Sequence, residues 1–406
     1  MDQSADTVEN ASASGPLAGV RVIEMGQLIA GPFCGQLLGD FGADVIKIEP
    51  PGEGDPLRQW GQPGYPLFWE QVARNKRTVT ANLRTKEGQE IARRLIAGAD
   101  MLIENFRPGT LEGWNLAPDR LRQSNPGLIV IRVSGYGQTG PYSARAGFGG
   151  IGEAMGGWRN IVGDADRPPS RMGVSIGDSL AATFACLGAL AALYNRTRTG
   201  RGQVVDASLF ESVLHVMESL VPDYAVAGHV RSRSGSILPG VAPSNAYMCK
   251  DGYYLIAANQ DSVFARLCGA IGRPELSGDP RYATHEQRGK NQAELDELIG
   301  AWTKQFLIDE VERLMIEAGV PAGRMYTARD MLADQHFRAR ETLVELDHPR
   351  WGKLPMQNAF PKLSDTPGSI RRMASQLAGQ DNEDVFGRVL GMTREDLEDL
   401  RLRGIV

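Results

Sequence analysis

One carboxylate, Asp178, is the residue of this chain best placed to do chemistry, because it stands directly ahead of a long apolar stretch. Residues 179–194 are rich in Ala and Leu and carry no charge, and Arg196 and Arg198 follow them. This composition predicts a buried helix with cations near its C-terminal end. An Asp just before such a helix is oriented by unpaired N–H groups, and the positive end of the helix dipole favours its ionised form. Taken alone, the pattern favours a helix cap, because capping Asp residues are far commoner than nucleophilic ones.

The chain ahead of Asp178 alternates between short apolar runs and helical patterns. Strands are predicted at residues 20–24, 44–48, 77–83, 100–104 and 128–133, with helices at 31–41 and at 86–97, the second capped by Thr85. Such alternation predicts a mainly parallel sheet, whose ligands bind beyond the carboxyl ends of the strands. Asn105 and Phe106, in the segment ENFRPG, and Tyr136, in SGYGQTG, each follow one of these strands.

The segment 135–140 matches the pattern GxGxxG after a strand, which is half of a dinucleotide-binding fingerprint. The other half is missing, because Pro141 and the glycine-rich AGFGG follow where a helix should begin. No acidic residue ends a strand about 20 residues further on. The sequence therefore disfavours an NAD site.

Composition excludes several classes of protein. The 406 residues suffice for two domains, and a net charge of -5 with interspersed signs argues against a nucleic-acid partner. The four cysteines and five histidines lack the spacing of a disulfide framework or a metal site. The apolar run 179–194 is too short to span a bilayer. Residues 1–15 are polar and acidic, which predicts a flexible tail on a cytoplasmic protein.

A change of pattern marks a second domain. Residues 245–258 alternate and contain an Asp251-Gly252 turn, which predicts a β-hairpin, and helical patterns follow at 261–271, 292–306 and 309–319. After the tail at 1–15, we expect a large α/β domain at residues 16–230 and a smaller α+β domain at 231–329. A C-terminal segment, 330–406, is expected to return to the large domain, extended and loop-rich with one helix near 394–403.

Four segments together carry a family resemblance. They are PLAGVRVIEMGQLIAGPFCGQLLGDFGADVIKIEPPGEGDP, NKRTVTANLRTKEG, ENFRPG with SGYGQTGPY, and GDSLAATFACLGALAALYNRTRTGRGQ. Over nearly the whole chain the sequence resembles the class III CoA-transferase family, also called the formyl-CoA or carnitine-CoA transferase family. The resemblance implies a Rossmann-like large domain, a smaller domain, and an interlocked dimer of two ring-shaped subunits. It also implies that a coenzyme A thioester binds as substrate and that no cofactor is bound permanently.

In this family the carboxylate matching Asp178 is the nucleophile, which forms an aspartyl-acyl anhydride and then an aspartyl-CoA thioester. The resemblance places CoA or substrate contacts at Leu28, Ile29, Ala81, Arg84, Asn105, Phe106, Tyr136 and Gly240. Gly240 belongs to an expected closing loop at residues 238–242. Formyl-CoA transferases have basic CoA contacts at positions where this chain has Pro50, Gly113 and Ser134. Lys76, Arg77 or Arg107 are therefore further candidates for holding CoA.

The substrate is expected to differ from that of formyl-CoA transferases, because Ile29 stands where those enzymes have a polar Gln. The segment SGSILPGVAPSNAY resembles members that take CoA from succinyl-CoA and give it to a C4 to C6 dicarboxylate such as malate, citramalate or itaconate. Candidates for binding the second carboxylate are Arg58, Arg171 and Ser236.

Three alternatives to this function stay open. They are a formyl/oxalate-type or carnitine-type CoA-transferase, an α-methylacyl-CoA racemase, and the mainly structural subunit of a heteromeric CoA-transferase. A racemase needs a His as one of its two proton-transfer groups, and the corresponding segment here reads AGFG, with Phe148 in its place. The expected partners are small molecules together with a second subunit, either an identical chain or a paralogous one.

Overall fold

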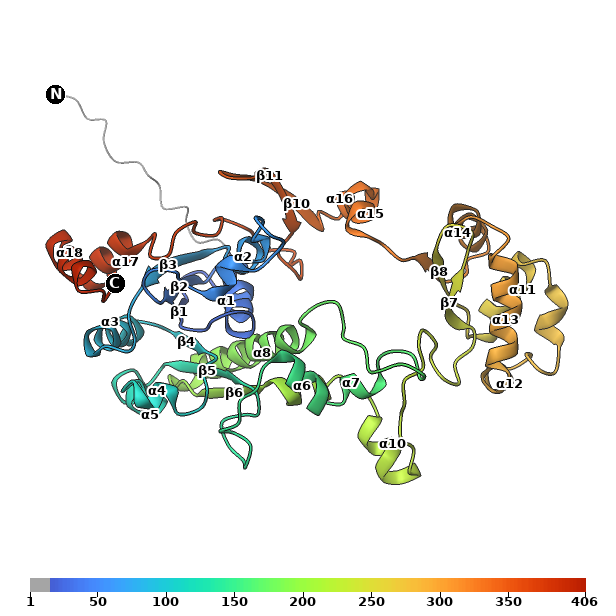
Figure 1. Cartoon of the computed structure of the whole chain (residues 1–406), viewed down its shortest axis with the longest axis horizontal. Helices are drawn as coiled ribbons and strands as arrows, with labels where there is room; N and C mark the ends of the chain where they lie inside the picture. Colours follow the sequence, from blue (N-terminus) through green and yellow to red (C-terminus); the bar gives the residue numbers. More distant parts are fainter. Residues whose placement is uncertain (1–14) are drawn as a thin grey trace. The chain divides into compact units, whose positions relative to one another are not determined.

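The computed structural model describes residues 15–406, which divide into two compact units (Figure 1). The first unit contains the described residues up to Trp158, Gly173–Ser219 and Glu341–Val406. The second contains Arg159–Met172 and Leu220–Arg340. The predicted N-terminal tail lies, except for Gly15, outside the described residues.

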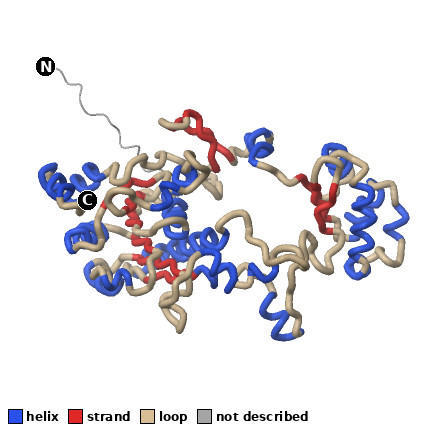
Figure 2. Tube along the Cα trace, viewed as in Figure 1, coloured by secondary structure: helices blue, strands red, loops and turns tan. Residues whose placement is uncertain are grey.

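A six-stranded parallel sheet forms the centre of the first unit, as predicted (Figure 2). Its order is β3-β2-β1-β4-β5-β6, and every neighbouring pair is parallel. The strands are β1 (Arg21–Glu24), β2 (Asp44–Glu49), β3 (Lys76–Thr80), β4 (Met101–Glu104), β5 (Ile129–Ser134) and β6 (Val204–Ser208). The chain reverses its direction of winding between β1 and β4. In sheets of this kind the ligand-binding crevice lies between the loops after two such strands, so we expect it here at the carboxyl edge.

Two helical layers cover the sheet. Alternate side chains of a strand point to opposite faces, so Val22 packs in one core and Ile23 in the other. The Val22 face is covered by α1 (Ala30–Asp40) and α8 (Ile176–Thr199), and the Ile23 face by α3 (Lys86–Ala97), α5 (Pro118–Ser124), α17 (Asn382–Leu390) and α18 (Arg394–Leu402). Burial on both faces explains the nearly continuous apolar runs of the strands. The predicted cap of α3 is confirmed, because Thr85 Oγ1 accepts a hydrogen bond from Gly88 N at 3.1 Å.

The first unit also contains smaller elements around this sandwich. They are η1 (Pro56–Gln59), α2 (Leu67–Val72), α4 (Thr110–Gly113), α6 (Gly149–Met155), α9 (Leu209–Leu214) and the antiparallel hairpin β10 (Leu343–His348) and β11 (Gly352–Gln357). The short helix α7 (Trp158–Ile161) begins at the last residue of the chain's first segment.

The central helix α8 differs from its prediction in start and length. It begins at Ile176 after the N-cap residue Ser175, so Asp178 lies inside its first turn and the predicted cap position of Asp178 is wrong. With 24 residues it is long and apolar enough to cross a membrane, which the shorter predicted run was not. It is nevertheless a core helix, because a stripe of alanines from Ala181 to Ala192 is fully buried against α1 and the sheet.

The second unit has its own sheet and its own core. Its antiparallel strands are β7 (Ser244–Met248), β8 (Tyr253–Ala257) and β9 (Ala322–Arg324), and the β7-β8 pair confirms the predicted hairpin. Tyr254, Phe264 and Leu295 are among the side chains buried in its core. Its helices are α10 (Leu220–Ala227), α11 (Asp261–Ala270), η2 (Pro274–Gly278), α12 (His285–Lys290), α13 (Gln292–Thr303), α14 (Ile308–Glu317), α15 (Ala328–Ala333) and α16 (Gln335–Ala339).

The loop-rich C-terminal segment predicted with a single helix contains more structure than expected. Besides α18, residues 330–406 contain the β10-β11 hairpin, α17, the end of α15 and α16. At the start of α17, Asp381 Oδ2 accepts a hydrogen bond from Thr78 N at 2.7 Å and Asn382 Oδ1 accepts one from Thr80 N at 2.9 Å. These side chains satisfy the outer N–H groups of the edge strand β3, a tertiary contact that the local pattern does not encode.

Candidate active site

Asp178 is the third residue of α8, and its carboxylate lies directly against the backbone of α6. A Cβ added to Gly149 would lie 2.1 Å from Asp178 Oδ2 and 2.9 Å from Asp178 Cγ. Only glycine therefore leaves room for the carboxylate in this place. The first turn of a 24-residue helix favours negative charge, because the positive end of the helix dipole lies there.

The glycine-rich segment ahead of α6 links Asp178 to Tyr136. A Cβ on Gly147 would lie 3.1 Å from Gly135 Cα and 3.1 Å from Tyr136 Cε2. The ring of Tyr136 follows the carboxyl end of β5 and neighbours the ring of Phe210 at a centroid distance of 6.5 Å. Close backbone packing requires Gly135 and Gly147, whereas Gly137 and Gly140 of the same motif have φ values of 86° and 82°, in the left-handed region that favours glycine. The contacts place Tyr136 and Asp178 at the same edge of the sheet.

The loops after β1 and β4, which flank the crevice, are joined by one side-chain amide. Asn105 Oδ1 accepts a hydrogen bond from Gln27 N at 2.8 Å, and Asn105 Nδ2 donates one to Gln27 O at 2.9 Å. The amide packs against Gly26 and Gly31, where a Cβ would approach it within 3.0 to 3.3 Å. Asn105, predicted as a CoA contact, thus holds the loop that carries Leu28 and Ile29.

A buried ion network, which sequence reasoning missed, supports the same loop. Lys47 Nζ lies 3.0 Å from Glu24 Oε1 and 2.8 Å from Asp55 Oδ2, and all three side chains are almost wholly buried. Burial alone lowers the pKa of Lys47, but the charges of Asp55, Glu24 and Glu49 outweigh it and hold this pKa above its ordinary value. The signal in the sequence was a Glu and a Lys inside the apolar strands VRVIE and DVIKIE.

The network fixes a strained backbone position. Asp55 Oδ1 accepts a hydrogen bond from Leu28 N at 3.1 Å, and Leu28 has a φ of 62°, in the left-handed region that residues with side chains rarely adopt. A non-glycine residue persists in such a conformation only where its surroundings hold it, and such positions cluster at functional sites. Asp55, itself paired with Lys47, therefore holds the backbone of Leu28 in place beside the crevice.

The side chains of the predicted CoA contacts differ in how far they are exposed to solvent. Ile29 and Ala81 are buried, with 5% and 2% of their surface exposed, so they shape the edge through backbone atoms and packing. Phe106 is half-buried with its ring against Trp114, at a centroid distance of 4.9 Å. Arg84 is exposed and, within residues 15–406, forms no ion pair.

The contacts of the other basic candidates show which of them are available to bind CoA or a substrate carboxylate. Lys76 is fully buried, with its Nζ 2.7 Å from Glu24 Oε2. Arg77, the second residue of β3, lies near the amino edge of the sheet, with its Nη2 2.7 Å from Asp44 Oδ1. Neither is available to CoA phosphates at the carboxyl edge, so these two expectations are wrong. Arg107, just after Phe106, is exposed and has no ion pair in the described part of the chain. Arg58 is bonded to Glu49 at 2.7 Å and stacks on Trp69, which removes it as a ligand for a substrate carboxylate.

A buried carboxyl lies beneath the β4 loop. Glu104 Oε1 accepts a hydrogen bond from Arg132 Nε at 2.6 Å, and Glu104 Oε2 accepts one from Phe106 N at 2.8 Å. Burial raises the pKa of Glu104 to about 7, although Arg132 and the Phe106 N–H act in the opposite direction. The backbone N–H of Phe106, a predicted CoA contact, is thus hydrogen-bonded to Glu104, a carboxyl group whose pKa lies near neutrality.

Gly240 belongs to the second unit, where its φ is 75° and it is exposed. Its N–H donates to Gln292 Oε1 at 3.2 Å, and Gln292 Nε2 donates to Leu238 O at 3.2 Å. Ser236 donates to Asn245 Oδ1 at 2.6 Å. The expected closing loop is therefore attached to the start of α13 by side-chain hydrogen bonds within its own unit.

Comparison with known proteins shows the family of this chain. A family model described as CoA-transferase family III matches residues 17–382. The chain is 55% identical over 395 residues to the succinyl-CoA–D-citramalate CoA-transferase of Chloroflexus aurantiacus, covering 96% of this chain and 98% of that one. It is 42% identical to the succinyl-CoA–L-malate CoA-transferase beta subunit of the same organism, covering 96% and 98%.

Its fold is similar to the crystal structure of a CaiB/BaiF family protein from Brucella suis, with a TM-score of 0.82, 35% identity, and coverage of 93% of this chain and 100% of that one. The family match begins at Leu17, before β1, and ends at Asn382, the first residue of α17, so it includes both Asp178 and the loops after β1 and β4. This chain is a member of CoA-transferase family III.

Proposed function

We propose that this enzyme transfers coenzyme A from succinyl-CoA to a C4 to C6 dicarboxylic acid, with D-citramalate as the preferred acceptor. The observation that supports the acceptor is the high identity, along nearly the full length of both chains, to an enzyme named for that acid. An acyl-CoA thioester enters as substrate, and the chemistry requires no permanently bound cofactor. We place this reaction in the cytoplasm.

The first half-reaction assigns the nucleophile to Asp178. One carboxylate oxygen attacks the thioester carbonyl of succinyl-CoA, the C–S bond breaks, and CoA leaves as a thiolate, so Asp178 becomes a mixed anhydride with succinate. The thiolate then attacks the aspartyl carbonyl and succinate leaves, which gives an aspartyl-CoA thioester. The first turn of α8, at the positive end of the helix dipole, favours the negative charge of the attacking carboxylate.

The second half-reaction runs in reverse with the acceptor. A carboxylate of the acceptor acid attacks the aspartyl carbonyl and expels the thiolate. The thiolate then attacks the acceptor's own carbonyl in the new anhydride, which forms the product thioester and regenerates Asp178. Each intermediate is an activated acyl group, so the energy of the thioester is kept provided that water is excluded.

Arg84 and Arg107 are the cations that we assign to the phosphates of CoA, because both are exposed on loops that leave the carboxyl edge. A guanidinium can bind a phosphate through two parallel hydrogen bonds. The racemase alternative is not favoured, because Phe148, which stands in the position of the racemase His, cannot accept a proton.

The test is turnover together with trapping. Purified protein is mixed with succinyl-CoA and, one at a time, D-citramalate, L-citramalate, L-malate, itaconate, glutarate, oxalate and carnitine, and new acyl-CoA products are separated by chromatography. We expect the largest kcat/KM with D-citramalate. Hydroxylamine added with succinyl-CoA should convert Asp178 to a hydroxamate that is visible by mass spectrometry.

The matched variants are Asp178→Ala and Asp178→Asn, which should fold normally and lose at least about 1,000-fold in kcat, since removing the nucleophile abolishes the covalent route. Retained turnover in either variant would remove Asp178 from the mechanism. Exchange only with oxalate or carnitine would replace the proposed acceptor class, and proton exchange at an α-carbon without CoA transfer would favour the racemase.

A further inference from the structure

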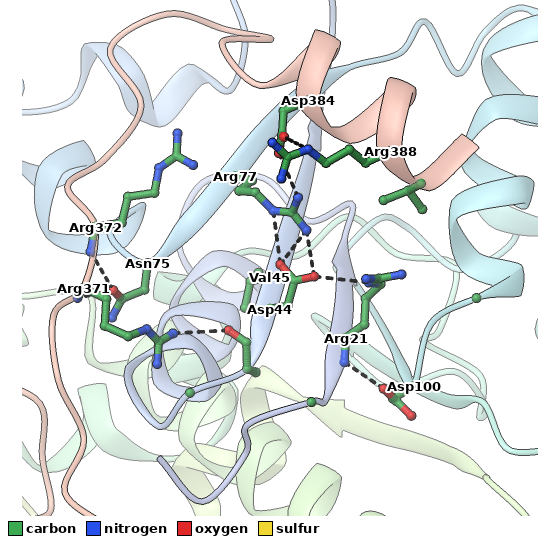
Figure 3. A pocket seen from close by; sticks show the side chains of 15 residues that line it. Arg21, Asp44, Val45, Asn75, Arg77, Asp100, Arg371, Arg372, Asp384 and Arg388 are labelled. Carbon is green, nitrogen blue, oxygen red and sulfur yellow. Dashed lines mark hydrogen bonds and ion pairs between the residues drawn. The ribbon is translucent and has the colours of Figure 1, made fainter. Parts of the chain in front are cut away.

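A second charged cavity lies at the opposite, amino-terminal edge of the parallel sheet (Figure 3). Its volume is about 1000 Å³, and it is lined by residues at or just before the starts of β1 to β4 together with residues of α17 and the segment before it. The six residues of β2 separate this edge from the carboxyl edge by about 16 Å. The cavity is therefore distinct from the crevice that contains the candidate active site.

Arginine dominates the lining. It contains five arginines and three aspartates, which are Arg21, Arg77, Arg371, Arg372, Arg388, Asp44, Asp100 and Asp384, so the lining carries a net charge of +2. Charged residues next to the lining offset one another. Arg196 pairs with Asp100 at 2.9 Å and Asp381 pairs with Arg372 at 2.6 Å, while Asp40, which lies near Arg371, is itself paired with Arg74 at 2.6 Å. The chain as a whole has a net charge of -5, so this concentration of positive charge is local.

Three of the guanidiniums share two carboxylates. Asp44 lies 3.1 Å from Arg21 Nε and 2.7 Å from Arg77 Nη2, and Asp384 lies 3.1 Å from Arg77 Nη1 and 2.8 Å from Arg388 Nε. This arrangement holds the three arginines in place and leaves an excess of positive charge on this side of the cavity.

The remaining two arginines, Arg371 and Arg372, lie on another side of the cavity, as Figure 3 shows, and their main chain is bonded to Asn75. The N–H groups of Arg371 and Arg372 donate to Asn75 Oδ1 at 2.7 and 3.1 Å, and Arg371 Nη2 donates to Gly39 O at 2.8 Å. Burial lowers the pKa of Arg371 although Asp40 and Asp44 lie near it.

The lining also indicates the size and class of the ligand. Among the lining residues that the structure describes there is no aromatic side chain on which a nucleobase could stack, and the uncharged members are small: Gly19, Gly42, Ala43, Val45, Asn75, Gly98 and Val389. A guanidinium can donate two parallel hydrogen bonds to one carboxylate. Guanidiniums on two sides of the cavity therefore suit a ligand that carries a carboxylate at each end. We propose that this cavity is a binding site for a small di- or tricarboxylate anion.

The test is calorimetric titration of the full-length protein with citrate, at constant ionic strength, with acetate and inorganic phosphate as comparison anions. The variants Arg372→Gln and Arg388→Gln each remove one positive charge from a different side of the cavity, and both residues are partly or largely exposed. We expect each to weaken citrate binding at least tenfold. The matched control is Arg93→Gln, an exposed arginine of α3 paired with Glu90, which should leave citrate binding unchanged.

Thermal unfolding of every variant shows whether it is folded, so lost binding in a folded variant supports the proposal. Citrate that binds equally to wild type, Arg372→Gln and Arg388→Gln would locate its site elsewhere and overturn the proposal. So would the absence of citrate binding to wild type, and phosphate binding as tight as citrate would overturn the ligand class. None of these measurements depends on turnover, so they stand apart from a failure of the proposed transferase activity.

Discussion

The close approach of Asp178 to Gly149 sets the position of the proposed nucleophile. In acyl transfer the attacking oxygen must meet a carbonyl carbon at near-contact distance, and a shift of about 1 Å can cost about 100-fold in rate. Gly149 leaves the space in which the carboxylate of Asp178 lies. The glycine therefore matters because of the side chain it lacks.

Gly149→Ala should reduce kcat by about 100-fold, because the new methyl would occupy the place of Asp178 Oδ2 and displace the carboxylate. Transfer kinetics with succinyl-CoA, together with thermal unfolding, check this expectation. Gly269→Ala is the control, because Gly269 is also helical but a Cβ there meets nothing within 4 Å, so its activity should not change. A Gly149→Ala enzyme with wild-type kcat would contradict the positioning role.

At the scale of elements, the loops after β1 and β4 are held by buried polar groups. The Lys47 network fixes the first loop, and Glu104 with Arg132 fixes the second. Buried charges contribute little net stability when paired, but they become costly when a partner is lost. Their value here is geometric, because they fix the backbone of Leu28 and Phe106 beside the crevice.

Glu104 should make stability depend on pH in the direction opposite to that of an ordinary ion-paired carboxylate. Its pKa is about 7 in the folded protein, against 4.5 ordinarily. Between these values the unfolded chain releases a proton that the folded protein keeps, so the free energy of unfolding falls as pH rises. The loss is complete above about pH 7 and amounts to about 3 kcal/mol.

Urea unfolding at several pH values between about 4.5 and 8 measures this contribution. Glu104→Gln, which mimics the protonated form, should remove the decline in the free energy of unfolding and still accept the hydrogen bond from Phe106. Glu112→Gln is the control. Burial acts to raise the pKa of the Glu112 carboxyl, but hydrogen bonds from the backbone and from Arg132 outweigh it, so this pKa lies below its ordinary value. Parallel pH curves for wild type and Glu104→Gln would show that Glu104 is already ionised at low pH.

At the scale of the whole molecule, the outer face of α8 is apolar and exposed. Leu187, Leu190 and Tyr194 follow one another at helical spacing on this face, and 61%, 38% and 68% of their surfaces are exposed. Contiguous exposed apolar surface of this kind is typical of protein interfaces. The family resemblance implies an interlocked dimer, and a relative is named as the beta subunit of its enzyme.

We expect the purified chain to form a homodimer that is active without a paralogous subunit. Light scattering after size-exclusion chromatography should give twice the mass of one chain, and Leu187→Glu should shift the population toward monomer because it places a charge on the apolar face. Leu402→Glu, at a leucine of α18 that is 81% exposed, should leave the assembly unchanged. A monomer that transfers CoA, or activity only after a second chain is added, would refute the homodimer.

The sequence by itself determined the alternation of strands and helices, the parallel sheet, the hairpin of the second unit and the family. These follow from local periodicity and from motifs that are contiguous in the chain. Only the tertiary structure decided that α8 begins at Ile176, with Asp178 inside its first turn, that Lys76 is buried, and that Arg77 lies near the amino edge. It also brought Asp381 and Asn382 to the edge of β3. The physical reason is that a charged side chain takes its role from the groups packed around it, and these come from residues far away in the sequence.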